Sequence, residues 1–200
     1  MIMHPIIKAG VLLLVFTAIS IFLVALTQQS NVERIKYNED QLLIKQLGEL
    51  VQDYDNDIVQ QKYTLKVELH GVDQILNIYP AKKQGRVFAF LVEHTYPKGY
   101  SGNIRLLTGI DNQGKLLGVR VISHKETPGL GDKIESRKSD WIKRFSGLSL
   151  SDPKRDYWKV KSDGGVFDAF TGATITPRAI VSATYQLLEF FNKQGLQNNK

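Results

Sequence analysis

The chain has 200 residues, 42% of them hydrophobic and 23% charged, and a formal net charge of +6. This composition is typical of a globular protein with one core and an appendage, and it excludes a largely disordered chain. The absence of cysteine excludes disulfides, thiolate metal sites and iron–sulfur clusters. Basic residues alternate with acidic ones and form no basic stripe, so we do not expect nucleic-acid binding.

The histidines also give no sign of a metal site. They are scattered singly, at His4, His70, His94 and His124, and no pair has the spacing of a helical zinc or iron motif. We therefore expect no bound metal. A redox role would require an organic cofactor.

An apolar segment near the N-terminus predicts a membrane helix. No charged residue lies between Lys8 and Glu33, and 18 residues of helix span about 27 Å, close to the thickness of a hydrocarbon core. We predict a transmembrane helix over residues 9–27, preceded by a short terminus over 1–8. A cleaved signal peptide is the alternative, but the sequence after the apolar run lacks the small-x-small cleavage pattern. Basic residues flank both ends, so charge leaves the orientation open.

Residues 28–60 are predicted to be a helical connector. Within it, residues 31–52 carry apolar side chains at roughly helical spacing. This stripe fits a helix that leads from the membrane to the domain. It fits equally well an ordinary packing helix of the domain itself.

Beyond residue 61 the pattern changes to short runs rich in β-branched and aromatic residues, separated by turn signals such as K-Q-G and D-N-Q-G. Their close spacing leaves no room for crossover helices and predicts an antiparallel meander. The runs are 64–70, 74–79, 86–94, 103–111 and 115–123.

Helical patterns follow the predicted strands. We expect one helix over 134–145 and a last helix over 177–192, with Thr176 as its N-cap and Pro177 at its first position. The predicted class is α+β: one N-terminal transmembrane helix, then a mostly antiparallel sheet domain with flanking helices over residues 61–200.

Three loops are rich in glycine and polar residues: K-G-Y-S-G at 98–102, H-K-E-T-P-G-L-G at 124–131, and the segment 162–174, which ends in D-A-F-T-G-A-T. Each can be a plain turn, and His124 can be a solvated side chain. The last loop places the Thr174 hydroxyl just before a helix, where unpaired N–H groups and the helix dipole stabilise an anion such as a phosphate. The alternative is a helix-entry loop with local threonine hydrogen bonds.

Other chemistries are not indicated. The sequence contains no G-x-S-x-G nucleophile motif, no P-loop and no dinucleotide fingerprint after a first strand. A hydrolase, an NTPase and a dehydrogenase are therefore poor descriptions of the chain.

The segment 168–174 resembles the acidic-x-x-[ST]-G-A-[ST] motif of a known family of FMN-binding domains. The family is shared by the G subunit of the Rnf electron-transport complex and the C subunit of the sodium-translocating NADH:quinone reductase. The loop at 124–131, and G-Y-S-G followed by L-T-G-I-D, resemble two further motifs of that family. All three occur in the family's order behind one N-terminal anchor, and the compact length favours the Rnf protein over the quinone-reductase one.

The resemblance implies a covalent cofactor. Thr174 would carry FMN through a phosphoester bond, which a flavin transferase installs from FAD with magnesium. The motif read by that enzyme would include Asp168, Thr171, Gly172 and Ala173. We expect loop residues to position the flavin ring, with glycines allowing close approach. These candidates are Tyr100, Ser101, Glu126, Thr127, Gly129, Leu130 and Gly131.

The resemblance also implies a location and a role. The anchor would lie in the bacterial inner membrane, with the sheet domain in the periplasm and the other membrane proteins of the Rnf complex as partners. The chain would relay electrons in a complex that couples electron transfer between ferredoxin and NAD to cation translocation, and it would not be catalytic alone. The alternatives are the FMN-carrying C subunit of the quinone reductase and a non-redox periplasmic scaffold or sensor.

Overall fold

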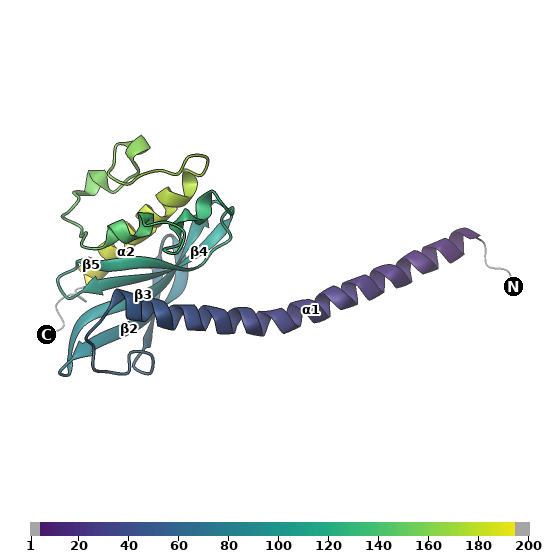
Figure 1. Ribbon diagram of the computed structural model, residues 1–200, viewed down its shortest axis with the longest axis horizontal. Coiled ribbons are helices and arrows are strands. Elements are labelled where there is room, and N and C mark those ends of the chain that lie inside the picture. Colours follow the sequence, from purple (N-terminus) through teal and green to yellow (C-terminus); the bar gives the residue numbers. More distant parts are fainter. Residues whose placement is uncertain (1–4, 195–200) are drawn as a thin grey trace. The chain divides into compact units, whose positions relative to one another are not determined.

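A computed structural model describes residues 5–194 of the chain (Figure 1). The chain divides after Leu42 into two compact units. The first unit consists of most of a long helix, α1 (Pro5–Leu50). The second contains the last turns of that helix, the sheet and the C-terminal segments.

The first unit carries the predicted apolar helix. Between Pro5 and Gln28 the mean hydropathy is 2.8, so this segment is long and apolar enough to cross a membrane. The hydroxyls of Thr17, Ser20 and Thr27 each donate to the carbonyl four residues earlier, at 2.8 to 2.9 Å. Hydroxyls satisfied within their own helix are compatible with lipid. The helix continues into the expected connector of residues 28–60 but ends at Leu50, and residues 51–62 are irregular apart from a turn at 58–61.

The second unit is built on a five-stranded sheet in which every neighbouring pair is antiparallel. The strand order follows the sequence, which confirms the predicted meander. The strands are β1 (Tyr63–Leu69), β2 (Val72–Lys83), β3 (Arg86–Gly99), β4 (Gly102–Asp111) and β5 (Leu116–Ser123).

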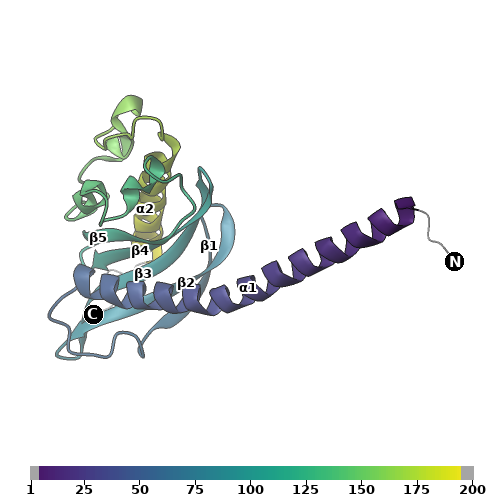
Figure 2. The same ribbon diagram turned by 45° about the vertical axis from the view of Figure 1, so that its right-hand side comes forward.

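Alternation along the strands divides the interior into two cores. On β3, Phe90 and Val92 point to one face, where they join the core that includes helix α2 (Ile175–Gln194). Leu91 points to the other face, where it packs in a core with Leu47 of the last turns of α1. Successive strand residues face opposite sides, so a strand that is covered on both faces has runs of consecutive apolar residues, such as Phe88–Val92 of β3. Figure 2 shows α2 on one side of the sheet.

The predicted helix over 134–145 is wrong in form, although its apolar residues are buried. Two short 3₁₀ helices replace it, η1 (Gly131–Ile134) and η2 (Trp141–Phe145). The Ser139 side chain accepts a hydrogen bond from the Trp141 backbone N–H at 3.1 Å. Local serine bonds of this kind compete with a continuous helix. The four apolar residues whose spacing predicted the helix are nevertheless all buried: Ile134, Trp141, Ile142 and Phe145.

The start of the last helix also differs from the prediction. Helix α2 begins at Ile175, so Thr176 and Pro177 lie inside its first turn, and Thr176 is not the N-cap. Proline is tolerated there because the first helical N–H groups have no partner within the helix. Thr174 is the residue directly before the helix.

Candidate functional site

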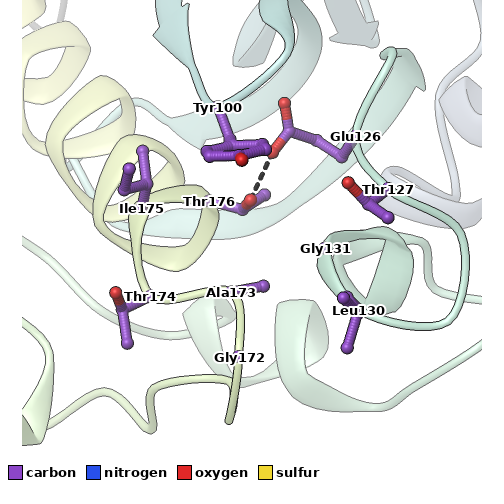
Figure 3. Close-up of a pocket in the computed structure, with 10 residues that line it drawn as sticks. All are labelled: Tyr100, Glu126, Thr127, Leu130, Gly131, Gly172, Ala173, Thr174, Ile175 and Thr176. Carbon is purple, nitrogen blue, oxygen red and sulfur yellow. Dashed lines mark hydrogen bonds between the residues drawn. The ribbon is translucent and has the colours of Figure 1, made fainter.

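Three loops meet in a cavity of about 310 Å³ (Figure 3). They are the turn between β3 and β4, the loop that follows β5 and the segment that enters α2, and the first turn of α2 completes the wall. The lining residues are Tyr100, Glu126, Thr127, Leu130, Gly131, Gly172, Ala173, Thr174, Ile175 and Thr176.

Most of the predicted site residues therefore come together, and four others lie just outside the lining. Ser101 approaches through its backbone, Gly129 shapes a turn at φ 78°, and Thr171 is exposed. The Asp168 carboxylate forms ion pairs with Arg144 and Lys161. Two lining residues, Ile175 and Thr176, were not among the predicted site residues.

The Glu126 side chain connects the three loops. Its Oε1 accepts a hydrogen bond from the Ser101 backbone N–H at 2.9 Å, and its Oε2 accepts one from the Thr176 hydroxyl. Glu126 is only 4% exposed and Thr176 only 1%, so these two residues form the floor of the cavity. Within the described part of the chain, Glu126 forms no ion pair with a lysine, arginine or histidine.

Behind Glu126, His124 is held by two hydrogen bonds and is not the solvated side chain that the sequence suggested. Its Nδ1 accepts from the Glu126 backbone N–H at 3.0 Å, and its Nε2 lies 3.1 Å from Oε1 of Glu135. An accepting Nδ1 places the ring hydrogen on Nε2, which donates to Glu135. Burial alone would raise the pKa of Glu135, but hydrogen bonds from Arg137, Lys138 and His124 lower it to about 2.

Two glycines leave room for the Glu126 side chain. A Cβ on Gly99 would lie 2.9 Å from Oε1 of Glu126 and 2.4 Å from a backbone oxygen of Gly102. A Cβ on Gly131 would lie 2.9 Å from the Thr176 hydroxyl oxygen and 3.0 Å from Cβ of Glu126. Both positions exclude any larger side chain without displacement of the floor.

The three threonines near the start of α2 have different environments. Thr171 and Thr174 are exposed, whereas Thr176 is buried with its hydroxyl bonded to Glu126. Among residues 5–194, no side chain or carbonyl takes a hydrogen bond from the Thr174 hydroxyl. A turn closed by the hydrogen bond from Ala173 N–H to Phe170 O at 3.1 Å, with Gly172 at φ 79°, presents Thr174 at the cavity.

Asp168 fixes the beginning of that segment. Its carboxylate pairs with Arg144 and, at 2.6 Å, with Lys161, and its backbone carbonyl accepts from the Trp141 indole N–H at 2.8 Å. Asp168 is 40% exposed. These contacts join the 168–174 segment to η2, so the acidic residue of the motif has a clear structural role.

The rim of the cavity is apolar and open. Tyr100 is 66% exposed, Leu130 41% and Ile175 45%. Binding sites for flat cofactors combine such apolar walls with a few fixed polar groups. The volume, the glycines and the hydroxyl at the mouth are compatible with a flavin mononucleotide.

The sequence alone did not identify the bond between Thr176 and Glu126, or the need for a glycine at position 99. Thr176 has a clear local interpretation as an N-cap, and nothing in the local sequence indicates a partner 50 residues away. Gly99 belongs to a glycine-rich motif that signalled a special turn, but its neighbour Glu126 comes from another loop.

Comparison with known proteins places these features in a class. Residues 99–189 match the model of an FMN-binding domain, and residues 1–50 match the model of an RnfG N-terminal region. The fold and the site thus define a protein with an FMN-binding domain behind one N-terminal helix of membrane-spanning length.

Similarity over nearly the full length gives the family. The chain is 44% identical over 197 residues to the ion-translocating oxidoreductase complex G subunit of Shewanella baltica, covering 97% of this chain and 93% of the relative. It is 41% identical over 192 residues to the G subunit of the same complex from Vibrio cholerae serotype O1, covering 95% and 92%. The chain belongs to the RnfG family, the G subunits of ion-translocating oxidoreductase complexes.

Proposed function

We propose that this chain is a membrane-anchored flavoprotein that carries FMN on Thr174 and relays electrons within an ion-translocating oxidoreductase complex. The observation that supports the attachment site is the exposed Thr174 hydroxyl, which stands at the mouth of the cavity directly before α2. Thr176 is the other hydroxyl of the lining in this segment, and it is buried and bonded to Glu126. The family's flavin domain and the name of the relatives support the electron-transfer role.

The attachment requires a second protein. A flavin transferase would move the FMN moiety from FAD to Thr174, forming the threonine O–P bond, breaking the pyrophosphate bond and releasing AMP and the hydroxyl proton. The unpaired N–H groups at the start of α2 would then stabilise the phosphate charge. The open mouth of the site gives such an enzyme access to Thr174.

Once attached, the flavin supplies the redox chemistry, and the protein holds and shields it. Tyr100, Leu130 and Ile175 would contact the ring with apolar surface, and Glu126 and Thr176 would close the floor. A cofactor that cannot dissociate suits a compartment without a free flavin supply. We therefore propose that the domain lies on the periplasmic side, with the helix over Pro5–Gln28 as its anchor.

The partners follow from the same proposal. The other membrane proteins of the complex would deliver and remove electrons, coupling ferredoxin and NAD chemistry to cation transport. The relatives are named as G subunits of an ion-translocating oxidoreductase complex, which favours this complex over the quinone reductase. Co-purification of proteins with many iron–sulfur ligands would support the assignment.

The direct test is covalent labelling. The full chain is co-expressed with a flavin transferase, and a denaturing gel is examined for flavin fluorescence at 22.6 kDa plus the mass of FMN. We expect a fluorescent band that survives denaturation. A chain without a fluorescent band overturns the covalent assignment to Thr174.

A further inference from the structure

Among the described residues, no basic side chain pairs with the Glu126 carboxylate on the cavity floor. Both oxygens of Glu126 accept hydrogen bonds, from the Ser101 N–H and the Thr176 hydroxyl, as an ionised carboxylate does. Both donors are neutral, and among the described residues the carboxylate forms no ion pair. It nevertheless lines an open cavity while being only 4% exposed itself.

Burial of a charge without a cation is unfavourable, so this arrangement needs an explanation. Buried carboxylates are usually paired, because desolvation costs more than neutral hydrogen bonds return. Two less exposed acids nearby follow that rule: Asp132 pairs with Lys138 at 2.6 Å, and Glu135 pairs with Arg137 and Lys138. Unusual charge placements in clefts are common at functional sites.

We propose that the Glu126 carboxylate lowers the reduction potential of the flavin in this cavity, an inference that rests on the proposed function. Each electron that enters the ring adds one negative charge, which is offset only as far as protons follow from water. A fixed negative charge at the wall of the same cavity opposes that addition. The effect is larger than in water because the floor has little solvent to screen the interaction. Charge near the ring is one of the means by which a protein tunes a flavin.

The local geometry keeps the charge in place. Gly99 and Gly131 give the side chain its space, and the Ser101 and Thr176 donors fix both oxygens. Figure 3 shows Glu126 and Thr176 pointing toward each other beside the Tyr100 ring. In this proposal Glu126 is a tuning residue, which acts on the flavin through its fixed charge.

The test is a redox titration of full-length, flavin-loaded protein, with dithionite as reductant and mediator dyes. Glu126→Gln keeps the shape and removes the charge, and we expect its flavin potential to be more positive than that of the wild type. Asp140→Asn is the matched control. Asp140 is 86% exposed, pairs with Lys143 at 2.5 Å and does not line the cavity, so this variant should titrate as the wild type does.

Two results of the titration overturn the inference. One is a Glu126→Gln potential equal to that of the wild type. The other is an equal positive shift in Asp140→Asn, because total charge and not position would then be responsible. A wild-type chain that takes up no flavin overturns the proposed function, and this inference with it.

A second measurement, made on the wild type, tests the inference if the Glu126→Gln variant takes up no flavin. The wild type is grown with ¹³C-labelled glutamate, loaded and examined by redox-difference infrared spectroscopy. Glu126 is the one carboxylate of the described lining, so reduction of the flavin should displace a labelled carboxylate band. A difference spectrum without a glutamate carboxylate signal overturns the inference.

Discussion

The Thr176 hydroxyl donates a hydrogen bond to the Glu126 carboxylate, so the first turn of α2 is joined to the loop after β5. This bond takes up the Thr176 hydroxyl and leaves Thr174 as the exposed hydroxyl of the lining on the segment that enters α2, whereas the exposed hydroxyls of Tyr100 and Thr127 belong to the other two loops. One interaction therefore bears on both the architecture of the floor and the place of flavin attachment.

The first prediction concerns the acceptor. Thr174→Ala should abolish the fluorescent band because it removes the attacking hydroxyl, whereas Thr174→Ser should keep it. Thr171→Ala is the matched control, since Thr171 is also exposed and lies in the same turn. Retention of the band by Thr174→Ala, or its loss in Thr171→Ala alone, would move the assignment to another residue.

The second prediction concerns the floor bond. Thr176→Val has nearly the same volume but leaves a buried carboxylate oxygen without a donor, which should lower the free energy of unfolding by about 1–3 kcal/mol. The measurement is urea unfolding of the full chain in detergent. Thr171→Val, at an exposed position, should change it by less than about 0.5 kcal/mol. Equal effects of the two variants would show that the bond to Glu126 contributes nothing.

The third prediction concerns glycine at 131. A Cβ added at Gly131 would lie 2.9 Å from the Thr176 hydroxyl oxygen. Gly131→Ala must therefore displace the floor and should lower the free energy of unfolding by about 1–3 kcal/mol. Gly48→Ala is the control, because that glycine lies in α1 with no atom within 4 Å of an added Cβ. Alanine there should be neutral or stabilising by up to about 1 kcal/mol. A Gly131→Ala chain as stable as the wild type would contradict the close packing.

The fourth prediction concerns pH and a buried histidine pair away from the cavity. His70 Nε2 lies 3.1 Å from His94 Nδ1, and His94 Nε2 lies 3.0 Å from the Thr108 hydroxyl. Burial, and then the neighbouring His70, lower the pKa of His94 well below its ordinary value of 6.5. Burial first, and then Lys98, lower the pKa of His70, against an opposing hydrogen bond that His70 Nδ1 donates to Oε1 of Gln186.

These directions fix the sign of the effect. Below the ordinary value the unfolded chain binds protons that the folded chain does not, so stability should fall as the pH drops below 6.5. Each histidine contributes at most about 1.4 kcal/mol per pH unit. Urea unfolding at about pH 7.5 and about pH 5.5 measures the loss, which should be smaller in His94→Asn. The same loss in both chains would exclude this pair as its source.

Much of the fold could be read from local patterns. Alternating runs and turn signals predicted the antiparallel meander, and a charge-free apolar segment predicted the N-terminal helix. These features depend on neighbours along the chain, where period and turn chemistry act directly. The glycine-rich loops also identified, by motif, most of the residues that line the cavity.

The rest depends on contacts between distant segments. The spacing of Ile134, Trp141, Ile142 and Phe145 predicts a helix, but these residues are buried from two short 3₁₀ helices, and between these the Ser139 side chain takes a hydrogen bond from the Trp141 N–H. Burial selects which side chains face the core without fixing the backbone between them. A periodic pattern therefore identified the core residues but not the element that carries them.

The sequence by itself determined that the chain has a helix of membrane-spanning length, an antiparallel meander of strands and a threonine, Thr174, directly before the last helix. The tertiary structure alone decided that Thr176 bonds to Glu126, that Gly99 and Gly131 make room for that carboxylate, and that within the described residues it has no cation beside it. The loops that carry these residues are distant in sequence and meet only in the folded domain. The partner of a buried polar group is set by that meeting, and not by its neighbours along the chain.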